Sequence, residues 1–559
     1  MKKVLAYLNS KKNYIILILV SLFVVFPLFT KINIYNFGHD SFFHIANIYS
    51  IVTNLQEGIF TNFDIRPIIA HNFGYGTGIF YPNLPHIITA IIAFIFNGNV
   101  FFALKIVHLL KYILAAFFMY KLVNKVFKNE LVALVAGIFY ITFPYTVAQV
   151  FIRDALAESF IIIFIPMILL GLYELFEGNR RNFYIYFVIG YVGIVNSHLV
   201  LAVFCTIFAI IYLLVNIKKV FTKENFKSLV FASILILILI SPFIAQLVQY
   251  NIVGGYGVFE DISLNDGTLS GSRKGFLDFI NPTPKSNYEG LVYYVSWIAI
   301  ILAIVSIVRY RKTIKEKADQ KKFFWYLIVS TILCIFLLSY LCPWLSLPKF
   351  MQYIQFAWRL DVFLVFFLSI LAALAFKDIE SKKIKIILLI FVIICNLVTV
   401  VTTYSFERLY EKDLQEIDMS FYGMGWQREY LPSNMLNNLE YFDNRSDDVI
   451  VKIGSAKVNI QKNNATELVV NIRNADNAII ELPKIYYLGY TAKFISEDGT
   501  EEKIEIYQNL NGFIETNIQN DGTLILTYER TIVAKIADAL FIITIAGIII
   551  VELRKRVKK

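Results

Sequence analysis

Asp40 is the residue whose type and setting point most directly to chemistry. It lies in the polar run Gly38-His39-Asp40-Ser41-Phe42-Phe43-His44, which follows the first long apolar segment of the chain. Ionisable groups beside a transmembrane helix are costly to place near lipid, so this cluster predicts a functional site. The carboxylate could accept a proton from an attacking hydroxyl as a general base. Two other interpretations stay open: Asp40 caps the helix that Ser41 begins, or Asp40 and His44 are ligands of a divalent metal ion.

A second charged group, Arg153 with Asp154 and Glu158, lies between two later apolar segments. A guanidinium beside carboxylates at the mouth of two spans suits the binding of an anion such as phosphate. The alternative is a structural salt bridge that caps the helix ends. The sequence therefore predicts a charged site here and leaves both roles open.

Arg359 lies near the outer end of another apolar segment, in the run Gln355-Phe356-Ala357-Trp358-Arg359. A charge in this position requires a partner, and a lipid phosphate is a suitable one. Asp361 is the structural alternative, although residues two apart on a helix face different directions. His198 is also predicted at the outer face, where a lone histidine is more often a packing residue.

The composition is that of a polytopic membrane protein. Of the 559 residues, 57% are hydrophobic and only 17% are charged, against roughly 25% charged residues in soluble domains. The net charge is +10, but the basic residues cluster at the ends of apolar segments, as in Arg309-Tyr310-Arg311-Lys312. This pattern indicates positive-inside anchoring rather than nucleic-acid binding. The four cysteines form no CxxC pair, so neither a disulfide framework nor a cysteine metal site is indicated.

Apolar runs bounded by basic clusters predict about twelve transmembrane helices, with the N-terminus inside the cell. The run Leu84 to Phe96 is too short to cross and is expected to enter from the outer face without spanning. The predicted spans are residues 14–30, 99–119, 131–147, 159–175, 183–197, 199–216, 228–249, 291–308, 323–341, 354–376, 384–402 and 532–551.

Three outer segments are long enough to hold a site: 31–98, 250–290 and 403–531. The first opens with helical spacing of apolar residues from Ser41 to Gln56, which predicts an amphipathic helix at the membrane surface. The third alternates apolar and polar residues between turns, which predicts an extracytoplasmic antiparallel β-sandwich-like domain. The expected organisation is a transmembrane module over 1–402, this β-rich domain over 403–531, and a last helix with a basic cytoplasmic tail over 532–559.

Taken together, these motifs resemble the bacterial membrane family labelled "6-pyruvoyl-tetrahydropterin synthase-related", over nearly the whole chain. No pterin chemistry is visible in the residues. That family is similar to the GT-C superfamily of membrane glycosyltransferases, which use polyprenyl-phosphate sugars and place an acidic catalytic residue in the first outer loop. Besides the three charged groups, the resemblance rests on the glycine-rich run Phe73 to Pro82, on Tyr430-Leu431-Pro432 and on the segment Leu482 to Tyr490.

The resemblance implies a GT-C-like fold and a role for each charged residue. Asp40 would be the catalytic base, with Asp154 and Glu158 as further acidic catalytic groups. Arg153 and Arg359 would contact the donor phosphate. The other predicted substrate-binding residues are His39, His44, His198, Gln355 and Trp358.

The function implied is transfer of a sugar from a polyprenyl-phosphate donor to an envelope glycan, lipid or protein acceptor, at the outer face of the cell membrane. A reaction with Asp40 as general base requires no cofactor, and the binding of a divalent metal by Asp40 and His44 remains an open alternative. The alternatives are a transporter or flippase for lipid-linked glycans and a non-catalytic envelope assembly protein. Ionisable residues look scarce at mid-membrane depth, where a translocation pathway would need them, and this argues against a transporter.

Overall fold

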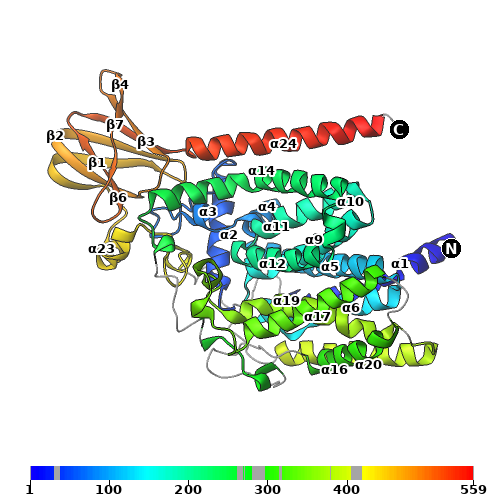
Figure 1. The fold of residues 1–559 in the computed structure, drawn as a ribbon. Helices are drawn as coiled ribbons and strands as arrows, with labels where there is room; N and C mark the ends of the chain where they lie inside the picture. The colour runs from blue at the N-terminus through cyan, green and yellow to red at the C-terminus, as the bar shows by residue number, and fades with distance from the viewer. Residues whose placement is uncertain are drawn as a thin grey trace. The chain divides into compact units, whose positions relative to one another are not determined.

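The computed structural model is a helical protein that carries one β-sheet near its C-terminal end (Figure 1). Contacts divide the chain into two compact units. The first comprises Met1–Ser41, Phe101–Ile236 and Leu264–Asp413, and the second comprises Phe42–Val100, Leu237–Ser263 and Leu414–Lys559. The structure describes residues 2–29, 38–260, 269, 271–279, 296–313, 318–377, 379–404 and 418–557, so much of the predicted 250–290 loop lies outside it.

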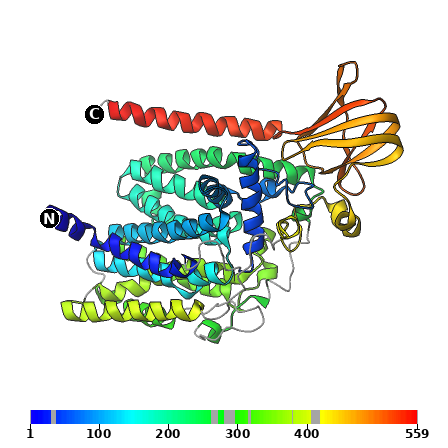
Figure 2. The same ribbon diagram turned by 180° about the vertical axis from the view of Figure 1, so that it is seen from behind.

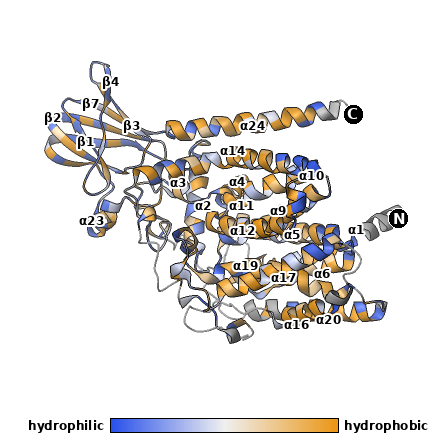
Figure 3. Cartoon of the chain, in the orientation of Figure 1, coloured by the Kyte–Doolittle hydropathy of each residue, from blue (hydrophilic) through white to orange (hydrophobic). Residues whose placement is uncertain are grey.

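Eight helical segments of the described chain are long and apolar enough to cross a membrane, which confirms a polytopic helical membrane protein. Figure 3 shows the hydrophobic residues along these helices. The segments are Lys11–Phe29, Val100–Phe127, Glu130–Phe151, Leu156–Phe176, Lys223–Val253, Ala318–Leu338, Ala357–Phe376 and Ile532–Arg554.

The count of twelve spans stays a prediction, because the other four predicted spans are not among the helices that are long and apolar enough to cross. Two of these are apolar but shorter, α12 (Leu199–Val215) and the part Trp297–Arg309 of α16 (Trp297–Thr313). The predicted span 183–197 is built from short α- and π-helical pieces, and 384–402 lies in α20 (Lys382–Tyr404). The run that was expected not to cross forms α4 (Leu84–Ile95), a helix of 12 residues.

Reporter fusions test the predicted orientation of these helices. A fusion after Lys125, in α5 (Val100–Phe127), is expected to report a cytoplasmic position. A fusion at Asn464, in the predicted extracytoplasmic domain, should report the opposite side. The measurement is the activity of phosphatase and fluorescent-protein fusions at both sites. An extracytoplasmic signal at Lys125 would overturn the map, and with it the outer position of Arg153.

The first unit is centred on α19 (Asp361–Ala373), all of whose residues are buried. A helix that is hydrophobic all round belongs inside a bundle. It packs against α6 (Glu130–Thr142), α16 and α17 (Ala318–Leu338), and Figures 1 and 2 show α6, α17 and α19 side by side from opposite directions.

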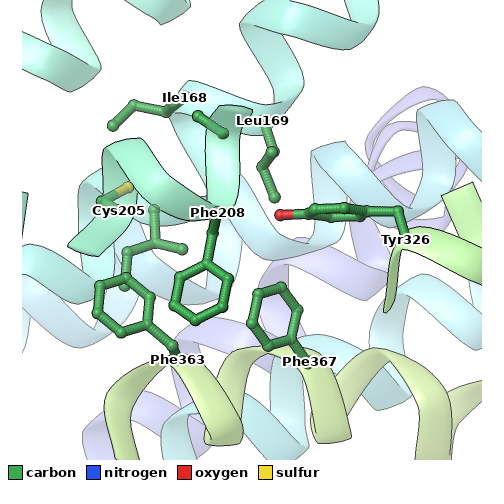
Figure 4. A pocket seen from close by; sticks show the side chains of 9 residues that line it. Ile168, Leu169, Cys205, Phe208, Tyr326, Phe363 and Phe367 are labelled. Atoms are coloured by element: carbon green, nitrogen blue, oxygen red, sulfur yellow. The ribbon is translucent and has the colours of Figure 1, made fainter. Parts of the chain in front are cut away.

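A small apolar cavity lies among the helices of this unit. The rings of Phe208, Phe363 and Phe367 lie around it, and Tyr326 approaches from α17 (Figure 4). No charged side chain lines the cavity. It therefore belongs to the packing of the bundle, and the chemistry must lie elsewhere.

The second unit contains a single antiparallel sheet of seven strands, in the order β4-β3-β7-β2-β6-β5 with β1 paired to β2. The predicted antiparallel domain is confirmed, but its strands form one hydrogen-bonded sheet instead of two facing sheets. The reason is β2, which is one continuous strand that pairs with β7 along its first part and with β6 along its second. The strands are β1 (Ile450–Asn463), β2 (Glu467–Ile485), β3 (Tyr490–Ser496), β4 (Glu501–Ile504), β5 (Tyr507–Gln508), β6 (Phe513–Ile518) and β7 (Gly522–Tyr528).

The predicted helix from Ser41 to Gln56 is confirmed as α2 (Ser41–Gln56), and its place at the membrane surface stays a prediction. Nearly all of its residues are buried or half-buried, including the polar ones. Asn47 accepts a hydrogen bond from Nε of buried Arg66 at 3.2 Å, and Asn54 donates to the backbone of Asn62. Asn47 and Asn54 are thus bonded to residues of the second unit.

Candidate active site

The loop that carries Asp40 lies directly on the backbone of a second loop in the first unit. The amide of Asp40 donates to the carbonyl of Arg153 at 2.8 Å, and that of His39 to the carbonyl of Ile152 at 3.2 Å. A Cβ atom at Gly38 would lie 2.6 Å from the carbonyl carbon of Arg153. Only glycine permits so close an approach, and the approach sets Asp40 beside Arg153.

Arg153 joins two carboxylates. Its guanidinium lies 2.9 Å from Oδ2 of Asp40 and 2.9 Å from Oε2 of Glu158, and it stacks over the ring of Trp358 at 4.2 Å. Burial opposes the charge, but the carboxylates of Glu158 and Asp40 outweigh it and raise the pKa of Arg153. The Asp40 side chain is 37% exposed, whereas that of Arg153 is only 8% exposed. Asp40 is therefore the accessible member of the pair.

Glu158, in α8 (Leu156–Phe160), is a buried counter-ion. Oε1 accepts hydrogen bonds from the Tyr145 hydroxyl at 2.9 Å and from Gln149 at 2.8 Å. Oε2 contacts both arginines, Arg153 at 2.9 Å and Nε of Arg359 at 3.2 Å. With both oxygens engaged, Glu158 holds the two guanidinium groups together.

Arg359 lies in η9 (Ala357–Leu360), just before α19. Its Nη1 donates to the carbonyl of Ile354 and to Oε1 of Gln355, each at 2.9 Å. No described residue bonds its second terminal nitrogen, Nη2, so that donor is available to an anion. The carboxylate paired with Arg359 is Glu158 and not Asp361, which instead lies 2.5 Å from Nζ of Lys274.

His198 precedes α12 and caps it, because its Nδ1 accepts the backbone amide of Leu201 at 3.3 Å. Burial, together with the guanidinium of Arg359, lowers the pKa of His198 to about 3. The imidazole is therefore neutral at physiological pH and carries its proton on Nε2. It presents an uncharged hydrogen-bond donor near the two arginines.

The remaining predicted site residues lie in different surroundings. Asp154 is 1% exposed and accepts from Ser41 and from a buried histidine, His108. His39 is exposed. His44 belongs to the second unit, where its Nδ1 lies 2.8 Å from Nε2 of His86. No group of three or more His, Cys, Asp or Glu side chains in the described part of the chain could hold a metal ion.

Sequence reasoning missed a row of basic residues inside the span of α5. Lys105, His108 and Lys111 are all buried. Their spacing of three residues within an apolar run was the available signal, because ionisable residues in a span are functional candidates by default. Three such residues in one candidate span weaken the argument against a transporter that rested on their scarcity.

These features define a class: a polytopic helical membrane protein in which a buried ionic network supports one accessible carboxylate. The family model described as "6-pyruvoyl-tetrahydropterin synthase related domain; membrane protein" matches residues 79–409, more than half of the chain. The protein belongs to this family. Comparison with curated proteins finds no match.

The chain is also similar to solved structures of an oligosaccharyltransferase from Archaeoglobus fulgidus. The complex with Zn and sulfate is 14% identical with a TM-score of 0.45, covering 72% of this chain and 54% of that one. The complex of the same organism's AglB with an inhibitory peptide and a dolichol-phosphate is 13% identical with a TM-score of 0.41. The match covers 72% of this chain and 56% of that one, so it spans about half the length of these proteins.

Proposed function

We propose that the protein is a membrane glycosyltransferase that moves a sugar from a polyprenyl-phosphate donor to an envelope glycan, lipid or protein acceptor. The observation that carries this proposal is the arrangement around Asp40. Its carboxylate is half-exposed, its Oδ1 accepts no hydrogen bond from a described residue, and two arginines that share Glu158 lie beside it. A base next to paired guanidinium groups suits attack on a phosphate-linked carbon.

In the proposed reaction, an acceptor hydroxyl attacks the anomeric carbon of the donor sugar. Oδ1 of Asp40 takes the proton of that hydroxyl as the new carbon–oxygen bond forms. The bond between the anomeric carbon and the phosphate oxygen breaks with inversion, and its electrons leave with the polyprenyl phosphate. Nη2 of Arg359 and Nε2–H of His198 would bind that phosphate, since both are donors with unused capacity.

The other predicted residues take supporting roles in this proposal. Glu158 orients the arginines, Gln355 fixes Arg359, and Trp358 provides the ring surface under both guanidinium groups. Asp154 is buried, so it would act on the loop of Asp40 instead of on substrate. His39 and His44 stay predicted substrate contacts. The described residues assemble no ligand set for a divalent metal, and the proposal routes no step through one.

The organisation of the chain is part of the proposal. Residues 1–402 would form the catalytic module and 403–531 an outer domain that recognises the acceptor. The last helix and basic tail, 532–559, would anchor that domain in the membrane. The active site would face the outside of the cell.

Donor turnover by the purified protein tests this function. The protein in lipid nanodiscs is incubated with a panel of polyprenyl-phosphate sugars, and release of polyprenyl phosphate is followed by mass spectrometry. The same preparation in vesicles is assayed for movement of a labelled lipid-linked glycan between leaflets. The buried basic residues of α5 favour this second candidate function, transport. Movement without cleavage of any donor would establish the transporter and overturn the transferase.

Arg359→Lys is expected to weaken donor binding by roughly ten- to a hundredfold, although the charge is kept. A lysine cannot reproduce a forked contact with phosphate oxygens, and a lost charge-assisted hydrogen bond costs on the order of 1.5–3 kcal/mol. Binding of a polyprenyl-phosphate sugar to the purified variant is the measurement. Arg180→Lys, whose arginine donates to the Leu175 carbonyl, is the matched control. Unchanged affinity in both Arg359→Lys and Arg359→Ala would leave Arg359 only the partner of Glu158.

A further inference from the structure

At three places in the first unit, two consecutive residues direct their side chains into different hydrogen-bonding networks. Asp40, Arg153 and Glu158 form the ionic network already described. Their neighbours Ser41, Asp154 and Ser159 turn the other way and join two residues of α5, His108 and Lys111. We call this second set the Lys111 chain: Lys111, His108, Asp154, Ser41 and Ser159.

The Lys111 chain is continuous and buried. Nζ of Lys111 lies 2.7 Å from Oγ of Ser159 and 3.0 Å from Nδ1 of His108. Nε2 of His108 lies 3.2 Å from Oδ1 of Asp154, whose Oδ2 accepts from Oγ of Ser41 at 2.6 Å. Every member is at most 3% exposed, so water does not compete for these bonds.

The Lys111 chain also bonds the backbone of the turn that carries Asp40. Oγ of Ser41 accepts the amide of Gly38 at 2.6 Å, and the amide of Ser41 donates back to the Gly38 carbonyl at 3.3 Å. The turn 38–41 is thereby closed on itself and tied to Asp154. Asp40 stands inside this turn.

One assignment of protons, with Lys111 charged, satisfies every bond of the Lys111 chain. Lysine is donor-only, so it donates to Nδ1 of His108, which then carries its proton on Nε2 and donates to Asp154. Asp154 must be ionised to accept from both His108 and Ser41. Ser41 therefore points its proton at Asp154 and its lone pair at the amide of Gly38. The donors therefore converge on Asp154, from Lys111 through His108 on one side and from the Gly38 amide through Ser41 on the other.

We propose that the Lys111 chain positions Asp40 for the reaction, with Lys111, His108, Asp154 and Ser41 as positioning residues that never touch substrate. This inference rests on the proposed function. Arg153 holds Asp40 by Oδ2 alone, and a single contact permits rotation of the carboxylate. Fixing the turn removes that freedom and keeps Oδ1 directed at the acceptor, which is where catalytic geometry matters most.

Ser41→Ala and His108→Phe test the proposal, with Ser369→Ala as the matched control. Ser369 is equally buried but bonds only the Val365 carbonyl in its own helix. The two chain variants should lower kcat by about ten- to a hundredfold, the expected scale for a misplaced catalytic group. Donor Kd should stay within about twofold, because the arginines are untouched. Ser41→Thr, which keeps the hydroxyl, should recover most of the turnover.

Combination with Asp40→Asn separates positioning from a loss of folding. If Ser41 acts through Asp40, Ser41→Ala should lower kcat no further in the Asp40→Asn background. A further tenfold fall there, or a parallel loss of donor binding in Ser41→Ala, would overturn the proposal.

A readout without turnover keeps this test distinct from that of the proposed function. Asp40 in the intact protein is labelled with a water-soluble carbodiimide and an amine, and the rate is measured by peptide mass spectrometry. Ser41→Ala and His108→Phe should raise the rate at Asp40 severalfold, whereas Ser369→Ala should not. Equal labelling in all four proteins overturns the positioning role even if the wild type transfers sugar. If the two variants are labelled faster at Asp40 but the wild type transfers no sugar, the link between the Lys111 chain and Asp40 stands and the transferase proposal is overturned.

Discussion

Asp40→Asn is expected to lower sugar transfer by about 10²–10⁴-fold, the usual scale for removal of a general base. Asparagine keeps the shape of the side chain and an oxygen that can accept from Arg153. The amide of residue 40 still donates to the Arg153 carbonyl, so the turn is retained. What is lost is the basic Oδ1, and the effect should therefore fall on kcat with little change in donor Kd.

Single-turnover kinetics with a polyprenyl-phosphate sugar measure this loss, and thermal unfolding in nanodiscs checks the fold. Asp443→Asn is the matched control, because Asp443 is a comparably exposed aspartate, 40% exposed, in an ion pair with Arg428 of the second unit. Turnover of Asp40→Asn near the wild-type rate would reduce Asp40 to a structural partner of Arg153.

Arg153→Met is expected to destabilise the first unit by about 3–5 kcal/mol, as removal of one member of a buried ion pair does. Glu158 would keep Arg359 but lose its second cation, and Asp40 would lose the one ion-pair partner it has among the described residues. The cation–π contact with Trp358 would also disappear. The measurement is denaturant or thermal unfolding of the purified protein.

A second substitution shows whether uncompensated charge is the cause. Arg153→Met combined with Glu158→Gln should be less destabilising than Arg153→Met alone, because the buried carboxylate is then neutral. Additive losses in the double variant would show that Arg153 stabilises the unit mainly by packing on Trp358.

The sequence could identify most charged members of the site but not their partners. Arg153, Glu158 and Arg359 each stood out as charges near the ends of apolar segments. That Glu158 would join both arginines depends on how separate helices pack, which no spacing within one segment reveals. Asp361, the alternative partner that proximity in sequence offered for Arg359, lies instead beside Lys274.

Asp154 illustrates a second limit. It lies next to Arg153 in sequence, yet its side chain faces the opposite way and is buried with His108. The helical structure is interrupted between α7 (Pro144–Phe151) and α8. Asp154 lies in this interruption with a φ of 49°, a left-handed conformation that aspartate tolerates better than most residues. The opposite directions of the Arg153 and Asp154 side chains follow from backbone angles in this irregular turn, which the residue types alone do not determine.

The β-domain was predictable in kind because its strands alternate apolar and polar residues, as β7 does with a buried residue at every second position. The continuity of β2 was hidden by the polar residues between Ile472 and Ala478, which resemble a turn in the sequence. In the structure this stretch is strand, and Asp476 is paired with Ser455 of β1 across an irregular register. Pairing with a neighbour outweighed the local preference.

The missing side chain at Gly38 has a consequence for the timing of catalysis. Because the turn and the Arg153 loop are in backbone contact, the carboxylate and its guanidinium partner are brought together once, when the chain folds. An arriving substrate then meets a charge arrangement that is already in place and does not have to reorganise at each turnover. Even alanine at position 38 would separate the two loops, so it should convert a preassembled site into one that must be reassembled for every molecule of substrate.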